Sequence, residues 1–189
     1  MKKFTKYILF ISLGLLCSCS DYLDIVPDNV TTLDIVFNNK NTAQRYLANC
    51  YHFVPDHGSV KRIPGMGAGH ECWFYTDKDS YFDNEVSFYI ARGLQNTNAP
   101  YANYWDGEGG SKLPMFRAIR ECNIFLSYVR DQHKVNDLTD SERKRWIAEV
   151  NVLKAYYHFF LFEHYGPIPI VDEALPVSTS SEGVKVTRM

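Results

Sequence analysis

The densest group of side chains suited to ligand contact lies between residues 70 and 85. Trp73, Phe74, Tyr75 and Tyr81 stand close together there, and Asn84 follows them. Aromatic rings offer flat apolar faces for stacking, and an amide beside them can donate and accept hydrogen bonds. The alternative is that the rings fill the core beneath a long loop, since most large aromatic side chains are buried. These residue types indicate noncovalent recognition rather than bond-breaking chemistry.

A second aromatic group follows further along the chain, at Tyr101, Tyr104 and Trp105, within the run "NAPYANYWDGEGG". Aromatic residues make up 15% of the whole sequence, so part of this content must be core. Tyrosine and tryptophan also suit exposed platforms with a polar rim, and sugars are one ligand class that stacks on them.

Motifs for catalysis or metal binding are not found in the sequence. The run "GMGAGH" lacks the Lys-Ser/Thr pair of a phosphate-binding loop, and no clear strand precedes it. His70, Glu71 and Cys72 are adjacent and so point in different directions, and no H-x-x-x-H or H-E-x-x-H motif occurs. A retaining glycosidase needs two carboxylates about 5 Å apart, and nothing selects such a pair. We therefore expect no metal, no cofactor and no enzymatic activity.

The charge of the chain argues against a nucleic-acid partner. The formal net charge is −2, and three of the lysines belong to the first six residues, so the remainder is more acidic still. A polyanion is bound by a basic surface, which this composition does not provide. The mean hydropathy of −0.27 indicates a soluble globular part with a real core.

The N-terminus has the features of an export signal. Lys2, Lys3 and Lys6 precede an apolar run from Tyr7 to Leu16, which is too short to span a bilayer. The run ends in "LLCSCSDYLD". This stretch resembles bacterial lipoprotein signals, in which a leucine is followed by two small residues and then by a cysteine. This resemblance selects Cys19 as the lipidated residue, because a bulky leucine directly precedes Cys17. The alternative is a core helix with two incidental cysteines.

Three ordinary cysteines remain once the leader is removed, Cys50, Cys72 and Cys122. An odd number in an exported protein leaves at least one thiol free. The sequence allows one disulfide and does not assign it.

Three helices would position the loops. The first covers residues 41–54, with Asn41 or Thr42 as its cap, and Pro55 stops it. Its apolar positions at helical spacing are Ala43, Tyr46, Leu47, Cys50, Tyr51 and Val54. Residues from 55 to about 110 read as loop, and an irregular stretch of this length usually has a function or is disordered. Its aromatic content argues against disorder.

The other two helices form a predicted hairpin. Residues 112–131 place Pro114 near the first turn and have one apolar stripe. That stripe comprises Phe116, Ile119, Asn123, Leu126 and Val129. Thr139 and Glu142 form a capping box ahead of a long helix that ends before Gly166. Its apolar face includes Trp146, Val150, Leu153, Tyr157 and Leu161. Two antiparallel helices of this kind are the unit of helical-repeat folds, although no clean repeat period is present.

At these helices the chain resembles the N-terminal part of the SusD/RagB family, the surface lipoproteins that cap TonB-dependent importers in Bacteroidota. The matching segments are "CSCSDYLDIVP", "NTAQRYLANCYHF", "NYWDGEGGSKLPMFRAIRECNIFLSYV" and "WIAEVNVLKAYYHFFLFEHYGPIPIVDEALPV". The last is long and specific. One departure is Lys154, where arginine is commoner; lysine keeps the charge but loses the bidentate fork. Glu149 and Tyr165 within this signature are expected to pack or to form hydrogen bonds.

The resemblance implies a mainly α, SusD-like fold of TPR-like helix hairpins with long irregular ligand-binding loops, incomplete at its C-terminus. The implied organisation is a signal peptide (1–18), a lipidated tether (19–38), a SusD-like N-terminal domain (39–175) and the truncated start of the next segment (176–189). An acidic residue just after the lipidated cysteine resembles the surface-export signal of Bacteroidota lipoproteins, which implies an outer-membrane protein that faces outward.

The implied function is noncatalytic glycan binding, with delivery of oligosaccharides to a SusC-like TonB-dependent transporter. Family members present loop aromatics and an asparagine to the glycan, which makes Trp73, Tyr75, Tyr81 and Asn84 candidates. Trp105 is a further candidate, although it matches a structural tryptophan of the family pattern and is expected to be buried. Two alternatives stay open, a peptide-binding subunit of a similar importer and a truncated remnant without function.

Overall fold

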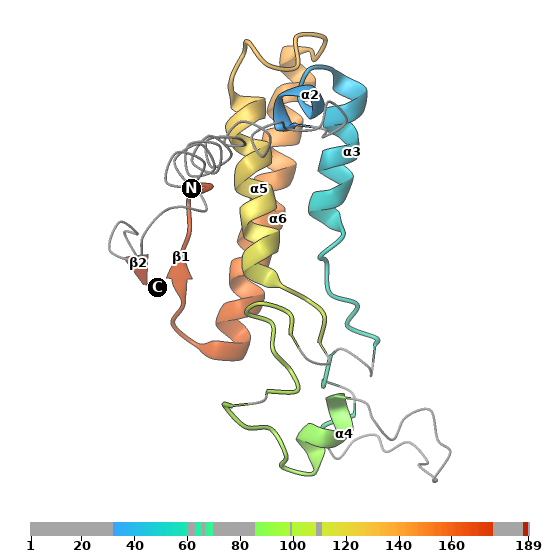
Figure 1. Cartoon of the computed structure of the whole chain (residues 1–189), viewed down its shortest axis with the longest axis vertical. Coiled ribbons are helices and arrows are strands. Elements are labelled where there is room, and N and C mark those ends of the chain that lie inside the picture. The colour runs from blue at the N-terminus through green and yellow to red at the C-terminus, as the bar shows by residue number, and fades with distance from the viewer. Residues whose placement is uncertain are drawn as a thin grey trace, which may run out of the picture. The chain divides into compact units, whose positions relative to one another are not determined.

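The computed structural model describes residues 32–59, 63–65, 67–69, 86–98, 100–108, 111–175 and 187–188. The described elements are α2 (Leu33–Val36), α3 (Lys40–Tyr51), α4 (Val86–Ala91), α5 (Met115–Arg130), α6 (Asp140–Tyr165), β1 (Pro169–Ile170) and β2 (Thr187–Arg188). From Val36 onward the chain forms one compact unit, in which α3, α5 and α6 run side by side (Figure 1). This mainly helical architecture confirms the predicted fold class.

Helix α3 begins one residue after its cap, Asn39, whose side chain accepts a hydrogen bond from the backbone N–H of Thr42 at 3.1 Å. The prediction of Asn41 or Thr42 as the cap is therefore wrong. The helix ends at Tyr51, and Val54 lies beyond it; both side chains are 42% exposed rather than part of the apolar face. Pro55 disfavours helical conformation at Val54, the residue directly before it, so the helix cannot continue through that position.

Helices α5 and α6 form the predicted antiparallel hairpin. Pro114 immediately precedes α5, and Ile119, Asn123, Leu126 and Val129 of the predicted stripe are buried, whereas Phe116 is partly buried. All five predicted apolar positions of α6 are buried as well. This hairpin and α3 enclose the core.

Local signals set the two ends of α6. Thr139 accepts a hydrogen bond from the backbone N–H of Glu142, whose carboxylate in turn accepts one from the N–H of Thr139, so the capping box is confirmed. Gly166 follows the helix with a φ of 72°, a conformation that glycine adopts at little cost. None of the helices in the described ranges is both long enough and apolar enough to cross a membrane.

The turn between the two helices is held by one buried arginine. Arg143 in the first turns of α6 donates hydrogen bonds to the carbonyl oxygens of Val129, Asp131, Lys134 and Val135, at 2.6 to 3.1 Å. Only 8% of Arg143 is exposed. Its guanidinium therefore satisfies carbonyl groups at the end of α5 that no later turn of helix could satisfy.

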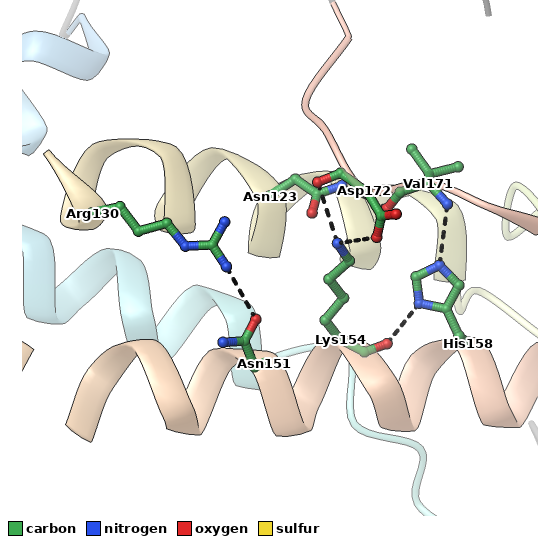
Figure 2. A network of polar contacts seen from close by, with 7 residues as sticks. All are labelled: Asn123, Arg130, Asn151, Lys154, His158, Val171 and Asp172. Carbon is green, nitrogen blue, oxygen red and sulfur yellow. Dashed lines mark hydrogen bonds and ion pairs between the residues drawn. The ribbon is translucent and has the colours of Figure 1, made fainter. Parts of the chain in front are cut away.

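The chain after α6 is attached to the hairpin by a polar network (Figure 2). Lys154 donates to the carboxylate of Asp172 at 3.1 Å and to its carbonyl oxygen at 3.3 Å. His158 accepts from the N–H of Val171 at 3.4 Å, and Asn123 of α5 donates to the Val171 carbonyl at 3.0 Å. Lys154 is thus paired with a carboxylate although it lacks the bidentate fork of arginine. Strand β1, which directly precedes Val171 and Asp172, pairs antiparallel with β2.

Part of the predicted loop region is ordered as the six-residue helix α4, which the sequence reading missed. Its Val86, Ser87 and Phe88 are buried, and the Ser87 hydroxyl donates to the carbonyl oxygen of Ile63 at 3.4 Å. A helix of six residues has fewer than two turns, so its hydrophobic periodicity is too short to be detected in the sequence.

Candidate functional site

A cavity of about 350 Å³ lies where the loop of residues 95–103 meets the end of α6. It is lined by Gln95, Asn96, Thr97, Pro100, Ala102, Asn103 and Tyr165. Amide and hydroxyl groups stand in this lining beside one aromatic ring, while apolar atoms provide the larger part of its surface. Such a volume is at the small end of the range for ligand sites and suits one small polar unit.

Tyr165 is the residue that fixes this loop to the helical core. Its hydroxyl accepts a hydrogen bond from the N–H of Tyr104 at 2.8 Å and donates one to the carbonyl oxygen of Ala102 at 3.4 Å. Burial raises the pKa of Tyr165 above its ordinary value, so the group stays a neutral donor and acceptor. The prediction that Tyr165 forms hydrogen bonds is confirmed.

The loop is also braced by its own side chains. The side-chain oxygen of Asn96 accepts from the N–H of Asn98 at 3.1 Å, and that of Asn103 accepts from the N–H of Trp105 at 3.1 Å. Gln95 accepts from the N–H of Tyr101 at 2.8 Å. These local bonds hold the loop in one shape, so amide groups at the cavity are positioned before any ligand arrives.

Trp105 is not in the core, and it packs against Tyr165, one of the residues that line this cavity. Its ring centroid is 4.5 Å from that of Phe116 and 5.8 Å from that of Tyr165, which it meets edge to face. The side chain is nevertheless 43% exposed, so the expectation of a buried tryptophan is wrong. Phe116 and Tyr165 thus contact the indole, and part of its apolar surface remains exposed to solvent.

Two other tyrosines of this region, Tyr101 and Tyr104, pack against other aromatic rings. Tyr101 stacks on Tyr89 of α4 with ring centroids 4.1 Å apart and planes within 3°. Tyr104 is 1% exposed and packs against Phe160, which places it in the core. Burial raises the pKa of Tyr104 above its ordinary value. The second aromatic group of the sequence is thus divided between the core and the cavity rim.

A second cavity, of about 320 Å³, lies between the C-terminal end of α3 and the start of α5. His52, Lys112 and Arg117 line it together with Asn49, and Phe53, Leu113 and Pro114 provide apolar surface. The positive charges of Lys112 and Arg117 favour the binding of an anionic group in this cavity over a neutral one.

Four of the predicted binding residues, Trp73, Tyr75, Tyr81 and Asn84, lie outside the described residues, as does the predicted lipidation site Cys19. Trp105 is the predicted residue that the structure places next to a cavity. The sequence reading did not single out Gln95, Asn96 and Asn103, because scattered amides in a loop give no periodic signal.

A family model described as "Starch-binding associating with outer membrane" matches residues 21–188 of the chain. The chain belongs to the SusD-like family. No curated protein matches it closely enough to count as a relative.

Membership of the SusD-like family agrees with the helical hairpin. The family description names a polysaccharide as the ligand and the outer membrane as the location. The SusD-like chain described here has an exposed indole that packs against Tyr165, and Tyr165 lines a cavity that also contains amide groups.

Proposed function

We propose that this protein is a noncatalytic glycan-binding subunit, anchored by lipid at Cys19 on the outer face of the outer membrane. It delivers oligosaccharides to a SusC-like TonB-dependent transporter. Membership of a starch-binding, outer-membrane-associated family supports the ligand class and the location.

The observation that carries the proposal is the exposed indole of Trp105, which contacts Tyr165 of a cavity that contains amide groups. A sugar ring has one face of C–H groups and a periphery of hydroxyl groups, so it matches an aromatic platform with amides at its edge. Asn96, Asn103 and Gln95 supply those amides, and Tyr165 joins the platform to the cavity. Trp73, Tyr75, Tyr81 and Asn84 extend the proposed site and contribute further stacking and hydrogen bonds.

Calorimetric titration of the full chain with maltoheptaose and with a panel of neutral and acidic oligosaccharides tests this proposal. Trp105→Ala should weaken binding by about tenfold or more, because loss of a stacking face costs about 1.4 kcal/mol. Phe159→Ala is the matched control, since this aromatic residue is 58% exposed on α6 and lines neither cavity. Equal affinities of both variants, or no binding to any glycan in the panel, would refute the assignment.

The lipid anchor has a separate test. Cys19→Ser should abolish incorporation of labelled fatty acid and release the protein from the membrane, while Cys17→Ser should leave both unchanged. Accessibility to a protease added to intact cells then distinguishes an outward-facing protein from one that faces the periplasm. Labelling that depends on Cys17 instead would overturn the choice of cysteine.

The transporter partner is tested by affinity purification from membranes after mild crosslinking. Recovery of a TonB-dependent channel supports the delivery role. If the chain binds peptides from a protein digest and no glycan, it is the peptide-binding counterpart on a similar importer.

A further inference from the structure

Two buried cysteines lie in the region where α3 packs against α5. Cys50 lies on α3 and Cys122 on α5, and both are free cysteines with no exposed surface. Hydrogen bonds fix the two helices at this level, because Glu121 accepts from the hydroxyl of Tyr46 at 2.5 Å and from the amide of Asn49 at 3.4 Å. The residues directly next to each cysteine are therefore joined across the helix interface.

The two thiols belong to one buried cluster of side chains. A hydrogen bond to Cys122, followed by burial, raises the pKa of Cys50 well above its ordinary value. Tyr157 of α6 belongs to the same core cluster, and its hydroxyl donates to the carbonyl oxygen of Cys50 at 2.5 Å. Packing of α3, α5 and α6 thus keeps the two cysteines, one on α3 and one on α5, close together.

We propose that Cys50 and Cys122 form a disulfide that joins α3 to α5 when the protein folds in an oxidising compartment. Each thiol loses its proton, the pair gives up two electrons, and one sulfur–sulfur bond forms. A disulfide-bearing oxidant, either an oxidised thiol–disulfide oxidoreductase or oxidised glutathione, takes up the electrons and protons and becomes two thiols. The compartment rests on the export proposed above, whereas the pairing rests on the packing alone.

The position of the bond gives it a role in the ligand site. Cys50 is near the end of α3 and Cys122 is within α5, so the bond encloses the whole loop region between these helices. That region contains Trp105 and the amide-lined cavity. A crosslink at both ends of the loops limits the conformations of the unfolded chain and fixes the base from which the loops project.

The burial of the pair determines when the bond forms. A thiolate is the reactive species, and a buried thiol with a raised pKa is rarely ionised and rarely reached by an oxidant. Oxidation should therefore accompany folding, when α3 is not yet packed on α5. Once formed, the bond is protected from reduction by the same packing.

Peptide mapping decides the assignment without any ligand, so its outcome is independent of glycan binding. The full chain is refolded with a mixture of oxidised and reduced glutathione, alkylated, digested and analysed by mass spectrometry without reduction. We expect a peptide pair linked through Cys50 and Cys122. Alkylation of both residues, or a bond from either of them to Cys72, would overturn the proposal.

Thermal unfolding provides the second measurement. Closing a loop of about 70 residues should raise the melting temperature of the oxidised protein by about 10 °C over the reduced protein. Cys122→Ala should remove this redox-dependent difference, and Cys72→Ala should retain it. Equal melting temperatures for oxidised and reduced wild-type protein would contradict the predicted link.

Discussion

Replacement of Arg143 by methionine tests how the α5–α6 hairpin is held. The guanidinium donates to four backbone carbonyl oxygens at the end of α5 and in the turn that follows. Methionine fills much of the same space, so the change removes the hydrogen bonds with little loss of packing volume. The polar contacts are therefore the main quantity that the substitution alters.

The expected cost follows from which carbonyl groups can reach water. The bonds to Val129 and Val135 are buried, but the Val135 oxygen also accepts a hydrogen bond from the N–H of Leu138 at 3.1 Å, so the Val129 oxygen is the buried acceptor that loses its partner. Those to Asp131 and Lys134 are partly buried and can regain water. An unsatisfied buried group costs about 1–3 kcal/mol, so one of them gives a loss of about 2 kcal/mol in the free energy of unfolding. For a chain of this size, that loss lowers the melting temperature by about 6 °C.

Urea and thermal unfolding followed by circular dichroism measure this loss. Arg143→Lys should be intermediate, since an ammonium keeps the charge but cannot reach four acceptors arranged around a planar fork. Lys144→Met at the adjacent exposed position is the matched control and should change stability by less than about 0.5 kcal/mol. If Arg143→Met behaves like this control, the argument that a buried guanidinium holds the turn is refuted.

Three further predictions concern the loop, the first turn of α6 and a close approach. Tyr165→Phe should destabilise the protein by about 1–2 kcal/mol and weaken glycan binding, because the N–H of Tyr104 loses its acceptor; an unchanged urea midpoint would contradict this. Hydrogen bonds from the ammonium of Lys40 on α3 and from the cap residue Thr139 lower the pKa of Glu142 to about 2. The contribution of Glu142 to stability is therefore full above about pH 4.5 and is lost as the pH falls from there to pH 2. Glu142→Gln should flatten this part of the stability profile, and identical acid titrations would disprove the assignment. Gly107→Ala should destabilise the chain by about 2 kcal/mol, because φ is 81° and a Cβ would lie 2.7 Å from Pro114; wild-type stability would show that this approach can relax.

Short-range patterns account for the parts of the fold that were predicted correctly. The capping box of Thr139 and Glu142 and the apolar stripe through Asn123 each depend on residues within a few positions of one another. The cap of α3 was misplaced because Asn39, Asn41 and Thr42 are all competent caps. Which of the three becomes the cap depends on where the chain before α3 changes direction. The packing of α3 against the other helices sets that point.

By itself, the sequence determined the helices of the hairpin, the family and the residue types available for binding a sugar, since periodicity and motif spacing are properties of neighbouring residues. Only the tertiary structure decided that Trp105 is partly exposed against Tyr165 rather than in the core, because Tyr165, far along the chain, fixes its loop from α6. The same holds for the closeness of Cys50 and Cys122, which depends on the register between α3 and α5. Contacts between distant segments follow from how whole helices pack, and no local pattern encodes them.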